Sequence, residues 1–537
     1  MNHAIRRQYI HLDLQGSESE GFALQNRLPE LCSQELLPAM ERVFDRYAPT
    51  EGYLYIERME IDLGNIPLQQ FESGLPEAVT RALEKALSEH IPPGEAHVGG
   101  DGDASMGGSA FVRLKSERQA ALETFVHFLE TGRLPWSFRL PPGVDLEQYL
   151  LTVWQGKTYS DPRTGGMGGT ADMGIPATAL APVLRAQAAR RRLVVQFSEA
   201  FLEVLLQSFS PGIHASVGRI RAALRAGSIA DSRRAAVISF EKHLWETAFG
   251  QSATTHQPAT GEAGLAALTA TALAATPAAA PVVLSLLKSI LTPVLTLFIK
   301  ALRERPGVQF AAMTPHLKTL FGAASLPDMG PVAAKKDAPG GIKKFSPAPS
   351  PAPASSAGAR PADTFPGLSS VPEEGVYVDN AGLVILHPFL QTFFEGLGIA
   401  RDGALVHPDR ALHLLHYLCT GQSPAPEYAL TLPKILCNIP LEEPVELDIE
   451  LTDKEKEEAT ALLEAAIRWW EALRNSGPDA LRGTFLCRPG KLSFRDDGDW
   501  LLQVERQGFD VLLDRLPWGI SVVRLPWMGG MVWVEWG

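Results

Sequence analysis

Two short segments near the N-terminus alternate apolar and polar residues with a period of two. They are Arg7–Leu14 (RQYIHLDL) and Tyr53–Leu63 (YLYIERMEIDL), and this period is typical of half-buried strands. Gly21–Arg46 and Phe71–His90 instead repeat their apolar residues every three or four positions, as amphipathic helices do. The order of these segments predicts a small β-α-β-α domain over residues 1–93.

The long middle of the chain has helical spacing that glycine- and proline-rich stretches interrupt. We predict a helical segment at residues 111–160 and a longer helical region at residues 176–327. Residues 94–110 and 161–175 are rich in glycine, and residues 328–370 are rich in proline and alanine. Such compositions cannot bury enough apolar surface to offset the entropy of ordering, so we interpret all three stretches as flexible or disordered linkers.

Residues 371–537 have the mixed pattern of a compact α+β domain. Thr452 and Glu455 have the capping-box spacing that opens a helix. Extended segments are expected at residues 376–378, 383–386, 485–488, 491–494, 499–506, 519–525 and 531–535. We therefore expect an α+β multidomain fold. It would have a small N-terminal β-α-β-α domain, a mostly helical middle with disordered linkers, and a C-terminal α+β domain that ends in an antiparallel sheet.

Residues 263–302 form a long apolar stretch, where we predict an apolar helix with an amphipathic second half. From residue 263 to residue 299 the only charged side chain is Lys288. The stretch is long enough to span a membrane, but three prolines interrupt it. We favour packing of its apolar stripe on a partner helix, including self-association, over membrane insertion, which stays an alternative. The candidate partner-binding residues on the stripe are Val283, Leu287, Ile290, Val294 and Phe298.

Tryptophans are concentrated towards the C-terminus. Such residues fill cores, but they are also enriched at buried contact centres between proteins, and both interpretations stay open. The strand expected at Met531–Trp536 is apolar on both faces apart from Glu535, so it could also add to the sheet of a partner. The candidate partner-binding residues of this region are Trp518, Trp527, Trp533 and Trp536.

Charge and cysteine content exclude several classes of protein. The formal net charge of -12 argues against nucleic acid as a partner, because a phosphate backbone attracts a basic surface. A local basic run, Arg190–Arg192, is interpreted as a solvated helix face. The four cysteines, Cys32, Cys419, Cys437 and Cys487, lack CxxC spacing, so we expect reduced and mostly buried thiols. The N-terminus turns polar before any apolar stretch, which predicts cytoplasmic synthesis without a signal peptide.

No pattern of residues indicates catalysis or a bound cofactor. His407, His413, His416 and Cys419 have a spacing compatible with a metal site, but the apolar neighbours of His416 favour a histidine at the edge of a core. The stretch around Asp101–Asp103 lacks the glutamate that closes a calcium loop. Nucleotide-binding, zinc-protease and serine-hydrolase motifs are missing from the sequence. We therefore expect no catalytic residue, no metal and no cofactor.

One short pattern occurs twice in the chain. Phe125–Trp136 (FVHFLETGRLPW) and Leu414–Pro426 (LLHYLCTGQSPAP) share an apolar-His-aromatic-Leu-x-Thr-Gly sequence. A glycine directly after a helical pattern predicts a helix that this glycine closes. Two copies do not establish a solenoid, which requires several repeats.

Several long segments of the chain resemble one known family, the contractile injection system tape measure proteins. The segments that carry the resemblance are Glu374–Leu390, His413–Val445 and Leu481–Trp536, with weaker similarity in Arg7–Leu63 and Phe128–Trp136. The LPW motifs at Leu516–Trp518 and Leu525–Trp527, followed by the WVEW ending, are the most specific part. The resemblance implies a structural component of phage-tail-like contractile particles, without catalytic residues. It further implies tube, baseplate or spike proteins as partners and a role in setting tube length.

The pattern departs from that of a simple molecular ruler. A fully helical chain of this length would reach about 800 Å, but both ends have globular patterns and prolines break the middle. We therefore keep a baseplate or spike adaptor without a ruler role as an alternative, and a membrane-perturbing factor acting through the apolar central stretch as another. An enzyme such as a cell-wall hydrolase is the weaker alternative, because it would need paired carboxylates in a cleft. The chain is expected to be incorporated in a particle, whose release from the cell is left open.

Overall fold

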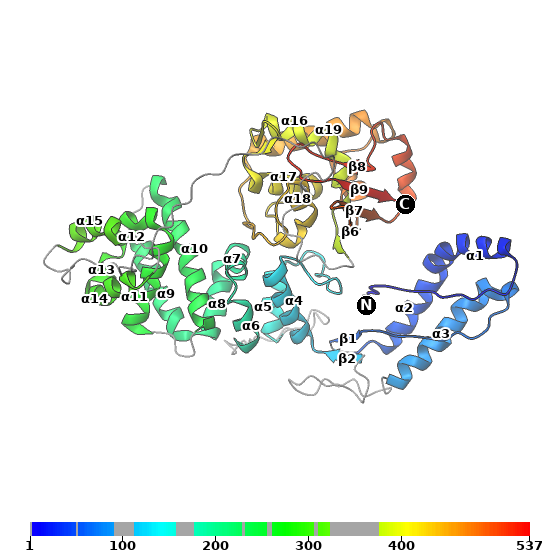
Figure 1. The fold of residues 1–537 in the computed structure, drawn as a ribbon, viewed down its shortest axis with the longest axis horizontal. Helices are drawn as coiled ribbons and strands as arrows, with labels where there is room; N and C mark the ends of the chain where they lie inside the picture. Colours follow the sequence, from blue (N-terminus) through cyan, green and yellow to red (C-terminus); the bar gives the residue numbers. More distant parts are fainter. Residues whose placement is uncertain are drawn as a thin grey trace, which may run out of the picture. The chain divides into compact units, whose positions relative to one another are not determined.

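The chain forms two compact units, whose helices and strands are labelled in Figure 1. In this computed structural model, the described residues are 3–49, 52–90, 112–156, 177–227, 231–254, 260–305, 310–322 and 375–537. The first unit comprises Met1–Phe128 and Leu134–Ile175, and the second comprises Leu129–Arg133 and Pro176–Gly537. The linkers expected at residues 94–110, 161–175 and 328–370 lie outside the described residues, as does the stretch around Asp101–Asp103.

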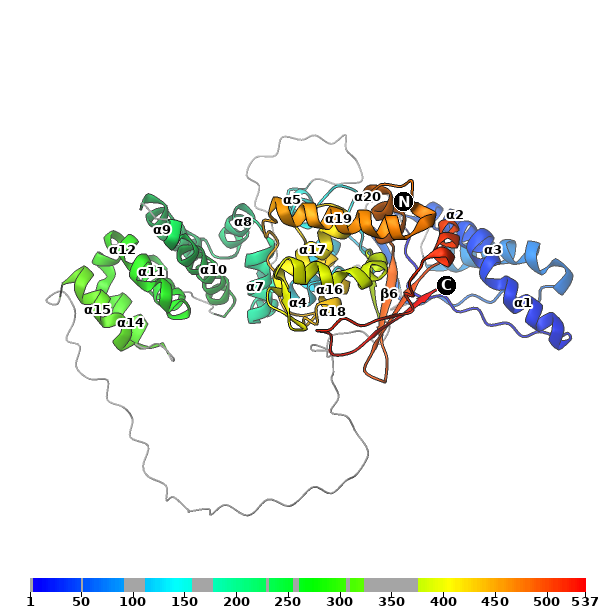
Figure 2. The same ribbon diagram turned by 90° about the horizontal axis from the view of Figure 1, so that it is seen from above.

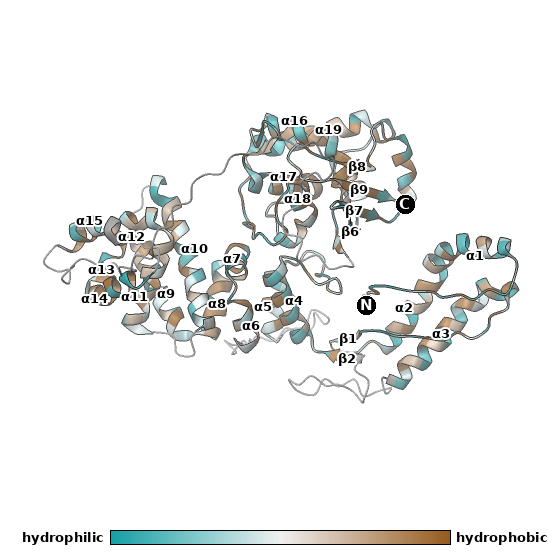
Figure 3. Cartoon of the chain, in the orientation of Figure 1, coloured by the Kyte–Doolittle hydropathy of each residue, from teal (hydrophilic) through white to brown (hydrophobic). Residues whose placement is uncertain are grey.

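The first unit is built mainly from amphipathic helices. Its elements are α1 (Glu18–Leu31), a π-helical turn η1 (Cys32–Leu36), α2 (Leu37–Tyr47), β1 (Tyr53–Ile56), η2 (Leu68–Gln70), α3 (Phe71–His90), β2 (Val112–Lys115), most of α4 (Glu117–Thr131) and α5 (Leu146–Trp154). Helices α2 and α3 pack together, and Figure 3 shows hydrophobic and hydrophilic residues interleaved along both. Two small cores result, one around Leu31 and Leu75 and one around Val43 and Leu83.

The strand expected at Arg7–Leu14 is wrong. Ile10 packs on the first small core whereas Tyr9 is 79% exposed, but Leu12 and Leu14, on the same parity as Ile10, are exposed as well, so the alternation marks a buried side only at Ile10. A strand also needs a partner for its backbone N–H and C=O groups, and no ladder in the described part of the chain includes Arg7–Leu14. Strand β1 pairs antiparallel with β2. Strand β2 lies within residues 111–160, where the sequence pattern predicts a helix.

The helical middle of the chain is confirmed. Its elements are α6 (Ala177–Val183), α7 (Gln187–Gln196), α8 (Glu199–Phe209), α9 (Pro211–Ala226), α10 (Asp231–Thr254), α11 (Gly261–Ala275), η3 (Pro277–Ala279), α12 (Ala280–Leu286), α13 (Lys288–Leu291), η4 (Thr292–Val294), α14 (Leu295–Arg303) and α15 (Phe310–Phe321).

The apolar stretch at residues 263–302 is not one helix. Pro277 and Pro293 each lie in a short 3-10 turn, because proline lacks the N–H that an α-helix requires and clashes with the preceding turn. Within the described residues no single helix is long and apolar enough to span a membrane. Gly261–Ala275 and Pro277–Leu286 reach that length only as a pair, and they are bent by 109°.

The C-terminal region combines helices with a five-stranded sheet. Its elements are β3 (Val376–Val378), η7 (Ala381–Leu386), α16 (His387–Gly396), β4 (Ala400–Arg401), β5 (Ala404–Leu405), α17 (Pro408–Thr420), η8 (Glu427–Ala429), α18 (Thr431–Leu436), α19 (Asp453–Trp469), η9 (Glu471–Leu473), α20 (Pro478–Leu481), η10 (Arg482–Leu486), β6 (Gly490–Phe494), β7 (Trp500–Val504), η11 (Gly508–Arg515), β8 (Val522–Val523) and β9 (Val532–Trp536). The helices α16 to α19 gather beside the sheet in two perpendicular views (Figures 1 and 2). Helices and strands share one core that includes Leu415, Trp500 and Leu502.

The sheet is mixed rather than antiparallel. The strand order is β3-β6-β7-β9-β8, and β9 runs parallel to β7, from Trp500↔Val532 to Val504↔Trp536. The connection between these two strands contains η11 and β8, so it is long enough for the crossover that a parallel pair requires. The other three pairings in this sheet are antiparallel.

Two segments expected to be extended are helical turns. Residues 383–386 belong to the 3-10 helix η7, and residues 485–488 overlap the π-helical turn η10. Residues 383–386 and 485–487 are continuous apolar runs, and the period of such a short run cannot distinguish a buried strand from a buried helix. The two turns press together so closely that a Cβ atom on Gly382 would lie 1.7 Å from the carbonyl oxygen of Phe485.

Candidate functional site

The apolar stripe of the central helices lies inside the helical region. Helix α12 contacts α9, α10 and α15, and α14 contacts α11. The side chains of Val283, Leu287, Val294 and Phe298 are at most 2% exposed, and Ile290 is half-buried. Their expected role in binding a partner stays a prediction, and a partner would reach the four buried side chains only after the helices rearranged.

The four candidate tryptophans are anchored within the C-terminal region. Trp527 is buried, and the other three are half-buried. Each indole N–H donates a hydrogen bond, and the pairs are Trp518 to Ile385 O (2.9 Å), Trp527 to Leu436 O (2.8 Å), Trp533 to Asp499 Oδ2 (3.1 Å) and Trp536 to Asp510 Oδ2 (2.9 Å). Strand β9 lies between β7 and β8. Where both of these strands pair with β9, it has no free edge to which a partner strand could add.

The two histidines of α17, His413 and His416, are buried in the C-terminal region. The Nε2 atom of His413 donates to Glu446 O over 2.8 Å, and burial lowers the pKa of His416 to about 4. His407 is exposed at the start of α17, whereas Cys419 is buried at its other end. Among the residues that the structure describes, no cluster of three or more His, Cys, Asp or Glu side chains could hold a metal ion.

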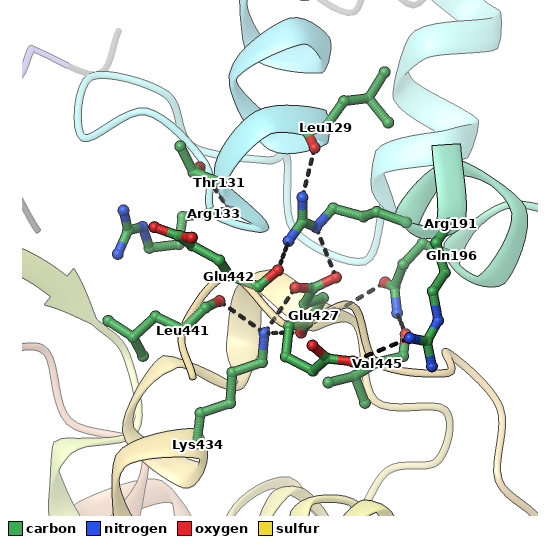
Figure 4. Close-up of polar contacts among 12 residues, drawn as sticks. Leu129, Thr131, Arg133, Arg191, Gln196, Glu427, Lys434, Leu441, Glu442 and Val445 are labelled. Carbon is green, nitrogen blue, oxygen red and sulfur yellow. Dashed lines mark hydrogen bonds and ion pairs between the residues drawn. The ribbon is translucent and has the colours of Figure 1, made fainter. Parts of the chain in front are cut away.

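A group of buried charges joins the end of α4, helix α7 and residues 427–447 (Figure 4). We call Arg192, Glu427 and Lys434, with their hydrogen-bond partners, the buried charge network. The Nε atom of Arg192 donates to Glu427 Oε2 over 3.0 Å, and Lys434 Nζ donates to Glu427 Oε1 over 2.7 Å. All three side chains are at most 2% exposed. One carboxylate therefore faces two cations that water does not reach.

Main-chain carbonyl groups stabilise the excess positive charge of the network. A buried cation without enough acceptors would be costly, so each remaining N–H needs an oxygen. Arg192 donates to the carbonyl oxygens of Leu129 (2.5 Å) and Glu442 (2.6 Å), and Lys434 donates to those of Leu441 (2.9 Å) and Glu443 (2.7 Å). These four carbonyl groups come from two segments far apart in the sequence, which the two cations thereby hold together.

Helix α7 and the C-terminal region are further joined through the Gln196 side chain. Its Nε2 atom donates to Val445 O over 2.6 Å, and its Oε1 atom accepts from Glu427 N over 2.9 Å. The backbone adds a direct bond from Leu447 N to Val195 O of 3.0 Å. Because a buried amide that makes two such bonds has one suitable orientation, Gln196 fixes the position of residues 427–447 along α7.

Two outer ion pairs accompany the network. Arg191 Nη1 lies 3.1 Å from Glu443 Oε1, and Lys242 Nζ lies 2.7 Å from Glu446 Oε1. All four side chains are between about a third and a half exposed. Solvent-exposed pairs of this kind contribute little stability, so the attachment depends mainly on the buried charges.

The repeated Thr-Gly pattern has the same local structure at both of its positions. Gly132 and Gly421 follow the last residues of α4 and α17 and have φ angles of +74° and +70°. The preceding threonine hydroxyl accepts a hydrogen bond from the backbone two residues on, Arg133 N to Thr131 Oγ1 (3.2 Å) and Gln422 N to Thr420 Oγ1 (3.0 Å). The prediction that these glycines close helices is confirmed.

Gly132 also leaves room for the network. A Cβ atom on this residue would lie 2.3 Å from Glu427 Oε1 and 3.2 Å from Arg192 Nε. Because the φ angle is positive as well, any other residue here would be strained and would displace the carboxylate. The loop after α4 is thus shaped to receive Glu427.

The electrostatics of the network indicate attachment rather than catalysis. Burial lowers the pKa of Lys434, and the carboxylate of Glu427 acts in the opposite direction. Burial also lowers the pKa of Arg133, next to the network, and Glu442 opposes that shift. A catalytic group must reach a substrate, whereas Arg192, Glu427 and Lys434 are covered and bind one another. The network can hold two parts of the chain in one arrangement.

The residues of the buried charge network were not predictable from a local pattern because their partners are distant in the sequence. Arg192 belongs to a basic run that predicts a solvated helix face, yet this residue is fully buried. One signal was available in the sequence, because Ala189, Leu193 and Gln196, which the structure also buries on α7, lie three or four residues from Arg192 or directly beside it. Glu427 and Lys434 gave a second signal, because they are the charged residues of an otherwise uncharged stretch, PAPEYALTLPKILCNIP.

Comparison with known proteins identifies a family. The sequence model of the family described as contractile injection system tape measure protein matches residues 2–536, nearly the whole chain. No curated protein and no solved structure matches. The matched range includes the N-terminal helices, the buried charge network and the C-terminal sheet.

Proposed function

Because this chain belongs to the contractile injection system tape measure protein family, we propose that it acts as a non-enzymatic scaffold that helps to set the tube length of its particle. The family implies a contractile particle with tube and baseplate components. The observation that carries the proposal is the extent of the match, from residue 2 to residue 536. A match of that extent includes both folded ends as well as the helical middle, so the whole chain takes part in the role.

The helices of the chain support a scaffold of short packed helices rather than one long helix. The longest helix that the structure describes is α10, with 24 residues, which corresponds to about 36 Å. The buried charge network attaches the C-terminal region to α7 and to the end of α4. Such a body can hold other proteins at fixed positions, and any ruler action would come from the length of chain between its folded parts.

The same attachment favours a second candidate function, a baseplate or spike adaptor without a ruler role. An adaptor needs a rigid body with surfaces for different proteins, and it does not need a length that matches the tube. We propose tube, baseplate or spike proteins as partners in either case, and self-association through the central helices as a further contact.

Tube length separates the two candidates. We would delete residues 331–366 from the full chain, and in another variant duplicate them, and measure the particle tubes by electron microscopy. A matched control replaces the same residues by a scrambled sequence of equal length. The ruler role predicts shorter tubes for the deletion, longer tubes for the duplication and unchanged tubes for the control. Unchanged lengths in all assembled particles would instead favour the adaptor.

Retention of the chain in the particle is the second test. Both candidates predict that mass spectrometry of purified particles finds this chain at a fixed number of copies. The absence of the chain from particles at every stage of assembly would contradict both. Turnover of cell-wall material by the purified chain would contradict the non-enzymatic part of the proposal.

A further inference from the structure

Two cysteines that are distant in the sequence lie side by side in the C-terminal region. The Sγ atoms of Cys419 and Cys487 are 3.5 Å apart, and Cys487 Sγ donates to Cys419 O over 3.2 Å. Both thiols are free. A disulfide bond requires about 2.05 Å between the sulfurs, so a closer approach of roughly 1.5 Å would join them.

The two thiols differ in access to solvent. Cys419 is in the last turn of α17 and is 1% exposed, whereas Cys487 directly follows η10 and is exposed. Cys487 lies between η10 and β6, outside both elements. A small reagent can therefore reach Cys487 first, and Cys419 is positioned behind it.

The surroundings of the pair favour the thiolate on the exposed cysteine. The hydrogen bond from Cys419 lowers the pKa of Cys487 to about 7, and the nearby Arg482 guanidinium acts in the same direction, although burial and Asp379 oppose them. The same contact with Cys487, together with burial, raises the pKa of Cys419 well above its usual value. Arg482 is held in place because its Nε atom donates to Leu418 O over 3.2 Å. The thiolate is the reactive form of cysteine, so Cys487 is the nucleophile.

We propose that Cys487 and Cys419 form a disulfide-forming site whose substrates are low-molecular-weight disulfides such as oxidised glutathione. The Cys487 thiolate attacks one sulfur of the small disulfide, which breaks the S–S bond and releases one small thiolate. Cys419 then loses its proton and attacks Cys487 Sγ, which releases the second small thiolate. The small disulfide is reduced to two thiols, and the protein dithiol is oxidised to one disulfide.

The other two cysteines provide an internal comparison. Cys437 is buried and Cys32 is half-buried, and within the described residues no sulfur contact joins either of them to another cysteine. Burial raises the pKa of both thiols. Cys32 and Cys437 are therefore expected to react more slowly with a small disulfide and to form no intramolecular bond.

The crosslink would close a loop that contains two residues of the buried charge network. Glu427 and Lys434 lie between Cys419 and Cys487 in the sequence, as do α18, α19 and α20. Crosslinking residues that are 68 positions apart restricts the unfolded chain, which raises the stability of the folded state. This chemistry follows from the thiol geometry and does not depend on the proposed scaffold role.

The test uses the full chain, fully reduced and then incubated with oxidised glutathione. A thiol count in denaturant should fall from the four cysteines of the sequence to two, and peptide mass spectrometry should find the Cys419–Cys487 crosslink. The oxidised chain should unfold at a higher temperature than the reduced chain. Cys419→Ser should accumulate a glutathione adduct on Cys487 that persists, because the resolving thiol is missing. Cys487→Ser should leave Cys419 unmodified.

Two control variants keep the result interpretable. Cys32→Ser and Cys437→Ser should form the Cys419–Cys487 crosslink as readily as the unsubstituted chain. The proposal is overturned if the unsubstituted chain keeps a glutathione adduct on Cys487 without closing the internal bond. It is also overturned if Cys32 or Cys437 reacts first, or if disulfides form only between chains.

Discussion

Arg192 and Glu427 lie 235 positions apart in the sequence, yet the Arg192 Nε atom donates to Glu427 Oε2 over 3.0 Å with both side chains fully buried. The contact attaches helix α7 to the C-terminal region. Lys434 shares the same carboxylate, so one residue, Glu427, balances two buried cations.

Glu427→Gln should strongly destabilise the second unit. The substitution keeps the shape of the side chain but leaves Arg192 and Lys434 without a buried counter-charge, which costs about 3–5 kcal/mol. Urea unfolding followed by tryptophan fluorescence measures the change. As a control, Glu443→Gln removes the partner of Arg191 in an outer ion pair, where both side chains are half-exposed. This substitution should lower the unfolding free energy by roughly 1 kcal/mol or less. Equal losses for the two variants would contradict the special role of the buried carboxylate.

Gly132→Ala should lower the unfolding free energy by more than backbone strain alone accounts for. A Cβ atom there would meet Glu427 Oε1 at 2.3 Å, whereas a Cβ atom on Gly398 has nothing within 4 Å. Both glycines have φ angles near +70°, +74° for Gly132 and +69° for Gly398, so Gly398→Ala is the matched control. It should lose about 1–2 kcal/mol of unfolding free energy, and Gly132→Ala should lose roughly 1–3 kcal/mol more. Similar losses would show that the carboxylate adjusts freely.

Glu455 should make the C-terminal region sensitive to acid below about pH 4.5. Burial acts to raise its pKa, but hydrogen bonds from Arg410 and from Thr452 outweigh burial and lower the pKa to about 2. Because the pKa in the folded state is below that of the unfolded chain, the stabilisation is complete above the unfolded pKa and is lost as the pH falls towards 2.

Glu455→Gln tests this acid dependence. The difference in unfolding free energy between the unsubstituted chain and the variant should be largest near neutral pH and should shrink between pH 4.5 and pH 2. Glu464→Gln, which changes an exposed residue on the same helix, should show no such trend. A difference that stays constant with pH would mean that the substitution acts through packing alone.

Two adjacent tryptophans at the end of α19 should differ strongly in how much their substitution changes stability. Trp470 is fully buried and donates to Leu512 O over 3.1 Å, whereas Trp469 is 66% exposed. Trp470→Ala should lose about 3–5 kcal/mol of unfolding free energy because it creates a cavity and leaves an acceptor without its donor. Trp469→Ala should change stability by less than about 0.5 kcal/mol. A large loss at Trp469 would indicate that this side chain is covered in solution.

Local features of the fold were predictable from short stretches of sequence. Thr452 and Glu455 form the predicted capping box at the start of α19, and glycines close α4 and α17. The N–H groups at the start of a helix and the carbonyl groups at its end are satisfied by residues within a few positions. A pattern a few residues long is therefore enough to identify such features.

Strand pairing could not be predicted in the same way. Arg7–Leu14 and Tyr53–Leu63 have the same alternation, but only Tyr53–Ile56 of the second is a strand. The difference is the availability of a partner, because β1 pairs with β2 at residues 112–115. The parallel pairing of β7 with β9 depends in turn on the path of the connection between them.

By itself, the sequence determined the helical and strand periods, the helix ends and the resemblance to a family that the full-length match confirms. Only the tertiary structure decided which charges are buried, which strands are neighbours and that Cys419 meets Cys487. The first group depends on contacts within one or two helical turns. The second depends on contacts between residues tens to hundreds of positions apart, and no local pattern reports the free energy that such contacts supply.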